Sequence, residues 1–219
     1  MTARDVVSDH FEQYREYLHA ELQRMVSYAA VYKRIEERKA DRLKEMNIAP
    51  AFFGVAADAL YSGIIIWVDK LLDENGDRGF FNLLSFVEDN RDCFSIESLR
   101  QRQRYSDGHW MLDRDEITFA SIERDRERLR SAPGLKSIQL RRDKFHAHFD
   151  KKYFFDPSRF KEEAPIKWSD LDAIVALLRE ILNTYSAGYD GKLFAVTPFN
   201  IGDIDHLLDR LHKADKESG

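Results

Sequence analysis

Apolar residues recur at steps of three or four along most of this chain, which is the spacing that places them on one face of an α-helix. The first stripe predicts one long helix from about Val6 to Met46, stopped near Pro50 because proline cannot continue a helix. Its apolar members are Phe11, Tyr14, Leu18, Leu22, Met25, Ala29, Tyr32, Ile35, Ala40, Leu43 and Met46.

A second helix is predicted from about Pro50 to Glu74, and it is apolar nearly all round, which is typical of the middle of a bundle. The stretch Ala51–Val68 also approaches the length that crosses a membrane. Asp58 lies near its middle, where a carboxylate would be costly in a bilayer, so we favour a buried core helix and expect no membrane partner. Residues 75–79 are a predicted turn.

Shorter helices follow, separated by Gly, Pro or polar residues. The helix from Trp168 to Gly188 has the strongest stripe, and Ser169 and Asp172 stand at the spacing of a capping box. The other predicted helices are Phe80–Asn90, Ile96–Gln103 with Ser95 as N-cap, Asp115–Ser131, Leu135–His148 and Asp203–Lys213. Between them we expect a loop over Tyr105–Leu112, an irregular stretch over Tyr153–Pro165 and an extended segment over Lys192–Phe199. The whole pattern indicates an all-α, bundle-like fold.

The composition fits this fold and narrows the compartment. The chain has 219 residues, and its 43% hydrophobic content is enough to build a core. Its 10 Gly and 5 Pro are too few for a turn-rich β sandwich. The single Cys93 excludes an internal disulfide and a cysteine-based zinc site, and it suits a reducing compartment. The first residues show no signal-peptide pattern, so we expect a cytoplasmic protein.

Charge is distributed unevenly. The net charge of −5 argues against a generic binder of polyanions. Basic residues nevertheless exceed acidic ones between Ser121 and Lys144. The basic residues there are Arg124, Arg126, Arg128, Arg130, Lys136, Arg141, Arg142 and Lys144, and the acidic ones are Glu123, Asp125, Glu127 and Asp143. Taken alone, the part from Arg124 to Arg130 indicates a helix face covered by ion pairs.

The basic region ends in Arg-Asp-Lys-Phe-His-Ala-His, residues 142–148. A histidine can move protons near neutral pH, and an arginine can hold the charge that builds on phosphate oxygens. Cleavage of a phosphodiester needs both. In a regular helix Arg142 shares a face with His146, and Arg141 with His148, whereas Arg142 and His148 point about 120° apart. The two residues need not come from one chain, because two copies related by a two-fold axis could bring both histidines and both arginines to a shared cleft.

Two other interpretations of this heptapeptide remain open. Cations near the C-terminal end of a helix can simply interact with the helix dipole and with the last carbonyl groups. His146 and His148 could instead bind a metal with Asp150, although no third ligand of matching spacing is evident. The other histidines stand alone, and no phosphate-binding glycine loop or hydrolase motif occurs. We therefore expect neither a metal nor a cofactor.

The heptapeptide resembles the R-x(4–6)-H signature of HEPN domains, in which the residue after the arginine is usually Asn, Asp or His. Arg142 is followed by Asp143, and Ala147 directly precedes His148. Arg141 also has a suitable spacing but lacks the polar residue after it. The chain looks most like the abortive-infection, AbiU-type HEPN proteins. Their long first helix is similar to Val6–Met46, and the end of their second helix and the short helix after it are similar to residues 64–86. The resemblance covers about residues 6–185.

This resemblance implies a homodimer with a metal-independent ribonuclease site at the dimer interface. Arg142 and His148 would be the catalytic pair, and Asp143 would orient Arg142. Lys144 and His146 could hold a neighbouring phosphate, with Arg141 beside them. The implied partners are RNA, a second copy of the chain, and a cognate antitoxin or another defence-system protein.

The expected organisation is one HEPN-like helical domain over residues 1–190, with an extended segment and helix over residues 191–219 packed on it. The function implied is that of a toxin or phage-defence effector. The alternative is a catalytically inactive HEPN module that binds a partner protein, a nucleotide or RNA, because some HEPN domains have lost activity.

Overall fold

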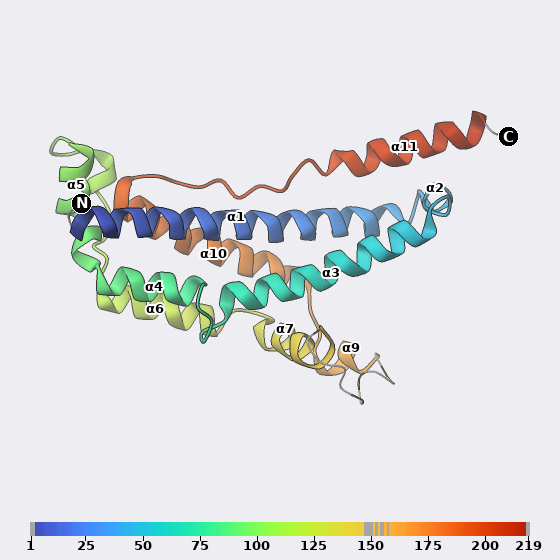
Figure 1. The fold of residues 1–219 in the computed structure, drawn as a ribbon, viewed down its shortest axis with the longest axis horizontal. Helices are drawn as coiled ribbons and strands as arrows, with labels where there is room; N and C mark the ends of the chain where they lie inside the picture. The colour runs from blue at the N-terminus through green and yellow to red at the C-terminus, as the bar shows by residue number, and fades with distance from the viewer. Residues whose placement is uncertain (1–2, 147–150, 152, 154–155, 157, 218–219) are drawn as a thin grey trace.

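The computed structural model describes residues 3–146, 151, 153, 156 and 158–217, and the regular elements within them are all helical. The predicted all-α class is therefore confirmed (Figure 1). The α-helices are α1 (Ala3–Arg38), α2 (Leu43–Met46), α3 (Pro50–Leu72), α4 (Phe80–Asp89), α5 (Ile96–Gln103), α6 (Phe119–Arg130), α7 (Leu135–Arg141), α9 (Arg159–Glu163), α10 (Trp168–Asp190) and α11 (Gly202–Glu217). Short 3₁₀ turns cover Arg91–Phe94 (η1) and Trp110–Leu112 (η2), and a π turn covers Arg142–His146 (η3).

The long first helix ends earlier than the stripe predicts. α1 stops at Arg38, and a turn separates it from the short α2 (Leu43–Met46). Between Ile35 and Leu43 the chain offers only Ala40 as an apolar residue, so little packing holds those residues in helix. The prediction of one helix from Val6 to Met46 is wrong at its C-terminal end. Met46 is nevertheless buried, in a small cluster with Ile35.

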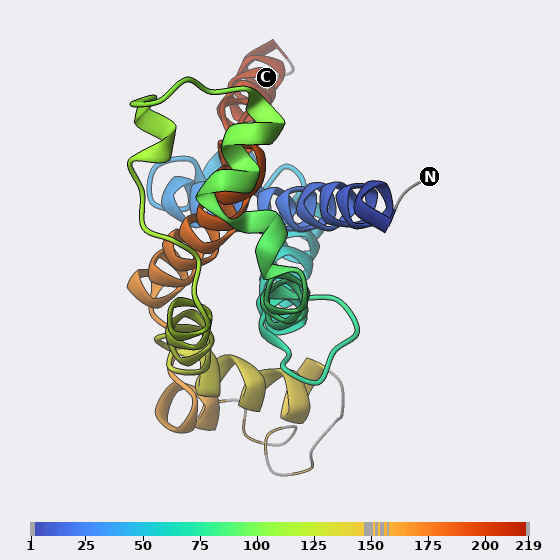
Figure 2. The ribbon, with the colours of Figure 1, turned by 90° about the vertical axis from the view of Figure 1, so that its left-hand side faces the viewer.

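The core lies between the first half of α1, the second half of α3, and helices α4, α6 and α10. Figure 1 shows α3 running back along α1, with α10 crossing behind them. Figure 2 shows α4 and α6 end-on beneath this layer. The buried members include the largest apolar residues of each stripe: Phe11, Leu18, Leu22, Ile64, Ile65, Val68, Phe80, Leu83, Ile122, Leu129, Ile174, Leu178 and Ile181.

The apolar helix α3 is not buried on all sides. Its second half lies in the core, but in its first half Phe52 is 58% exposed and Val55 70% exposed. The prediction of a central buried helix is therefore wrong for that half, which extends past the bundle beside the end of α1 (Figure 1). By length and composition alone α3 could cross a membrane, and 28% of its most apolar stretch is buried.

α10 begins at Trp168 as predicted, but its capping residue and its end differ from the prediction. The carboxylate that caps its first turn belongs to Asp170, which accepts the backbone N–H of Lys167 at 3.3 Å, rather than to Asp172. The helix continues through Gly188 and ends at Gly191, which has a φ of +77°. Gly188 is needed for close packing instead, because a Cβ there would lie 2.6 Å from Ile117. That contact buries Ile117 just before α6.

The shorter helices follow the sequence closely. The N-cap prediction for Ser95 is confirmed, because its side chain accepts the backbone N–H of Ser98. The break at Pro133–Gly134 is also confirmed, with α6 ending before it and α7 beginning after it. α6 begins later than predicted, at a capping box formed by Thr118 and Ser121. Two predicted irregular segments contain a helical turn each, η2 and α9.

After α10 the chain runs as the predicted extended segment along α1 to the final helix α11 (Figure 1). Asn183 holds Phe194 through both backbone groups, and Ser27 of α1 accepts the backbone N–H of Phe199. Ion pairs then join α11 to α1 and α2; they are Arg34–Asp205, Arg38–Asp205, Arg42–Asp209 and Lys44–Asp215. The division at residue 190 stays a prediction.

Candidate functional site

Arg142 lies where the regular helix α7 gives way to the π turn η3. Its Nη1 is 2.9 Å from Oδ2 of Asp69 on α3, and its Nε is 2.7 Å from Oδ1 of Asp143. Neither ion pair uses Nη2, and the side chain is 34% exposed. Two carboxylates thus fix the guanidinium while part of it stays accessible to solvent. π turns occur frequently at functional sites.

Asp69 is the partner of Arg142 that the sequence interpretation missed. Its side chain is 8% exposed. Burial raises the pKa of Asp69, the Arg142 charge acts in the opposite direction, and Asp73 and Asp143 raise it further. A signal for it exists in the sequence, because Asp69 lies among the core residues Ile65, Val68 and Leu72 of the same stripe. A carboxylate in such a stripe requires a partner when it is buried.

A cavity of about 410 Å³ opens beside this pair, between the end of α3, the start of α4 and the α6–α7 region. Its lining carries charges of both signs, so it is not a simple anion site. The lining residues are Leu72, Asp73, Glu74, Asn75, Phe81, Arg130, Leu135, Lys136, Gln139, Arg142 and Asp143.

Arg141 has different surroundings from its neighbour. Its Nε donates to the carbonyl oxygen of Ala164 at 2.7 Å, and its Nη1 donates to the hydroxyl of Tyr61 at 2.8 Å. These bonds join α7 to α3 and to the start of the α9–α10 connection. The Arg141 guanidinium is therefore engaged in holding the fold together, whereas that of Arg142 lines the cavity.

The structure describes only some of the remaining predicted site residues. Lys144 is half-buried in the π turn. His146 ends that turn, but its side chain is not among those described, and His148 and the metal alternative with Asp150 lie outside the described residues. The angular argument for Arg142 and His148 assumed a regular helix through the heptapeptide. That assumption is wrong, because regular helix ends at Arg141.

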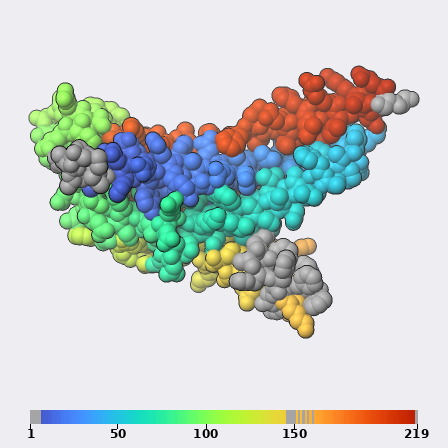
Figure 3. Space-filling view, viewed as in Figure 1, coloured from blue at the N-terminus to red at the C-terminus, as the bar shows by residue number. Residues whose placement is uncertain are grey.

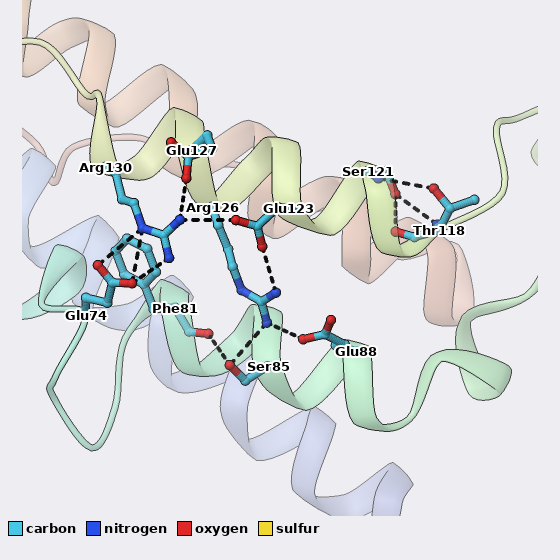
Figure 4. A network of polar contacts seen from close by, with 10 residues as sticks. All are labelled: Glu74, Phe81, Ser85, Glu88, Thr118, Ser121, Glu123, Arg126, Glu127 and Arg130. Atoms are coloured by element: carbon cyan, nitrogen blue, oxygen red, sulfur yellow. Dashed lines mark hydrogen bonds and ion pairs between the residues drawn. The ribbon is translucent and has the colours of Figure 1, made fainter.

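The arginines of α6 form ion pairs, as predicted for the part of the basic region from Arg124 to Arg130. Figure 4 shows Arg126 between Glu123 and Glu88 of α4, and Arg130 between Glu74, Glu123 and Glu127. Arg128 pairs with Glu180 of α10 at 2.7 Å. These arginines join α6 to the α3–α4 loop, α4 and α10, so the basic excess of the sequence does not form an open cationic surface there.

Three histidines outside the heptapeptide contact residues near them. His19 contacts the Ala195 carbonyl at 2.9 Å, His212 contacts Glu45 at 2.7 Å, and the His109 ring stacks on Tyr105. Within the described residues no three His, Cys, Asp or Glu side chains gather in a way that could hold a metal ion.

Comparison with known proteins gives one match. A family model described as HEPN_AbiU2: AbiU2 matches residues 8–209, which include most of α1, the helices from α2 to α10, the Arg142 site and the first half of α11. No curated protein and no solved structure matches the chain.

Proposed function

This chain belongs to the AbiU2 family of HEPN proteins, and from that premise we propose that it is a metal-independent endoribonuclease of abortive infection. The observation that carries the proposal is the position of Arg142, held by Asp69 and Asp143 at the edge of a cavity with Nη2 outside both ion pairs. A fixed guanidinium costs little further entropy when it binds phosphate.

The chemistry follows from the residues of the heptapeptide. The 2′-hydroxyl of a ribose attacks the adjacent phosphorus, so the chain would cut RNA and leave DNA intact. His148 takes the hydroxyl proton as general base, and a histidine returns a proton to the leaving 5′-oxygen. Arg142 donates to the non-bridging oxygens, where charge-assisted hydrogen bonds strengthen as the transition state forms. Lys144 and His146 would hold the next phosphate.

We further propose that the working form is a homodimer in the cytoplasm. A second copy would supply its own Arg142 and His148 to a shared cleft, as an isologous interface requires. The exposed apolar half of α3, with Phe52 and Val55, agrees with a surface that is covered in an assembly. A cognate antitoxin or another defence protein would be the natural means of silencing such an activity.

A second candidate function is an inactive HEPN module that binds a partner protein, a nucleotide or RNA. It is favoured by one observation: Arg142 contacts two carboxylates, so its charge is compensated within the single chain. The deciding experiment is incubation of the purified protein with RNA in EDTA. Cleavage that disappears in His148→Ala supports the nuclease, while intact RNA with the unmodified chain supports the binding module.

A further inference from the structure

Two hollows adjoin on the opposite side of the α3–α4 loop from the Arg142 cavity. The larger, of about 480 Å³, is lined by His10, Gln13, Tyr14, Tyr17, Asp77, Arg78 and Phe86. The smaller, of about 190 Å³, is lined by Tyr17, Glu21, Arg24, Trp67, Lys70, Leu71 and Arg78. Tyr17 and Arg78 line both hollows, so the two adjoin, and together they are called the groove below. Figure 3 shows the surfaces of α1 and of the α3–α4 loop meeting on the face toward the viewer.

The larger hollow is aromatic. Tyr14 stacks on Phe86 with ring centroids 6.3 Å apart, and Tyr17, which lines the same hollow, is 42% exposed. Burial raises the pKa of Tyr14, while a backbone hydrogen bond with Gly79 and the charge of Arg78 lower it. The Arg78 charge therefore lies close to these rings. A flat ring with a polar edge would fit against such walls.

The smaller hollow is cationic. Its lining has three cations, Arg24, Lys70 and Arg78, and one carboxylate, Glu21. Both Arg24 and Lys70 lie over the Trp67 ring, at 5.4 Å and 4.8 Å from its centroid. Glu21 is already engaged by Arg24 at 2.9 Å and by the indole N–H of Trp67. Within the described residues, Lys70 and Arg78 form no ion pair, so the hollow keeps an uncompensated positive charge.

We propose that this groove binds one nucleoside phosphate of a single-stranded RNA, with its base against Tyr17 and its phosphate on Arg78 and Lys70. An aromatic wall beside unpaired cations is the combination that binds single strands with little sequence preference. The inference rests on the proposed function, because it takes the RNA substrate from there.

The groove and the Arg142 site are joined through α3. Asp69, which pairs with Arg142, and Lys70, which lines the groove, are consecutive residues and point about 100° apart on the helix. The linings of the groove and of the Arg142 cavity include neighbouring residues at the end of α3, Leu71 and Leu72. In this proposal the strand continues around that helix end, and the groove holds a nucleotide on one side of the bond that is cut.

The test uses a labelled 2′-O-methyl oligoribonucleotide of about ten residues, which lacks the attacking hydroxyl and so reports binding alone. Its anisotropy is measured with the full chain in EDTA at several salt concentrations. We expect Tyr17→Ala to weaken binding on the order of tenfold, because one stacked base is lost, and Tyr17→Phe to restore it. Arg78→Ala should weaken binding and reduce the slope of log K against log salt by about 0.7.

Matched controls are Phe199→Ala, an exposed ring on the other side of α1, and Arg124→Ala, an exposed cation on α6; both should bind as the unmodified chain does. The proposal is overturned if the oligonucleotide does not bind, if the groove variants match the controls, or if AMP binds the groove while the strand does not. Binding in the groove without RNA cleavage would overturn the nuclease and leave the groove standing. If the protein cleaves RNA but Tyr17→Ala binds the oligonucleotide as the unmodified chain does, the groove is overturned and the nuclease stands.

Discussion

The Arg142 guanidinium lies 2.9 Å from the carboxylate of Asp69, which is nearly buried. The pair links the π turn to α3 and places the functional arginine and a charged core residue in one interaction. Its two members should therefore affect stability and activity differently.

Removing Arg142 alone should destabilise the protein, because Asp69 is then left as a buried carboxylate without a partner. We expect Arg142→Ala to lower the free energy of unfolding by about 1–3 kcal/mol. The double variant Arg142→Ala/Asp69→Asn should recover part of this loss. Urea denaturation of the four proteins of the cycle measures the coupling. Additive effects would show that the two side chains do not interact.

The same pair predicts the pH dependence of stability. Burial, the largest cause, raises the pKa of Asp69 above its ordinary value in the folded state. When folding raises the pKa of a carboxyl group, the contribution of that group to stability is fully present below the pKa of the unfolded state. The contribution is lost as the pH rises through the pKa of the folded state. Asp69→Asn should therefore gain stability relative to the unmodified protein as the pH rises through this range. Denaturation midpoints at a series of pH values test this, and parallel curves would contradict it.

Cleavage should depend on the geometry of the arginine as well as on its charge. Arg142→Ala should lower the rate of RNA cleavage on the order of 10²–10³-fold. Arg142→Lys should remain well below the unmodified rate, because an ammonium cannot reproduce the planar fork. Arg141→Lys is the matched control, since Arg141 bonds to Ala164 and Tyr61. A single-turnover assay in EDTA compares the rates, and full activity in Arg142→Ala would exclude the site.

A second buried pair should dominate stability away from the site. Arg15 is 1% exposed and donates two hydrogen bonds of 2.7 Å to Asp190. Asp190→Asn removes the buried counter-charge of Arg15 and leaves the more distant, half-exposed Glu12 at 3.5 Å, so we expect a loss of about 3 kcal/mol in the free energy of unfolding. The control Asp172→Asn removes an exposed pair with Lys33 and should cost at most about 1 kcal/mol. Equal losses in thermal or urea unfolding would contradict this ranking.

The attachment of α11 should weaken in acid and in salt. A hydrogen bond from Arg38, the largest cause, lowers the pKa of Asp205. The contribution of this carboxylate is therefore present above its unfolded pKa and is lost as the pH falls through its folded one. Relative to the intrinsic exchange rate at the same pH, amide hydrogen exchange in residues 202–217 should accelerate in acid and in high salt before exchange in α3 does. Simultaneous acceleration in both helices would show that α11 does not detach separately.

Local signals were sufficient for much of this fold. Ser95 caps α5 with its own side chain, and Pro133–Gly134 breaks the chain wherever it lies, so both features could be predicted from a few residues. The apolar stripe of α10 likewise needs no knowledge of its neighbours. The charge pattern of α6 was equally informative, because its acidic and basic residues alternate at helical spacing.

Features that depend on distant partners could not be predicted in the same way. The apolar stripe of the sequence continues past Arg38 to Ala40 and Leu43, but the chain turns there, and α11 from the far end of the sequence packs on α1 and α2. The stripe likewise does not distinguish the exposed Phe52 from the buried Phe53 beside it. Gly188 looks like a helix stop in the sequence, whereas its role is to admit Ile117 from another segment. The Asp69–Arg142 pair joins residues that are far apart in the chain, so the motif alone identified only one of its two members.

The π turn at Arg142–His146 bears on how many residues can separate the arginine of the motif from its histidine. Its hydrogen bonds span one residue more than those of an α-helix, so it accommodates one extra residue between the same entry and exit points. A relative with one residue fewer between its arginine and its histidine could keep the same path by closing an α-helical turn instead. We therefore expect that deletion of one residue within η3 can be accommodated by closing an α-helical turn in place of the π turn.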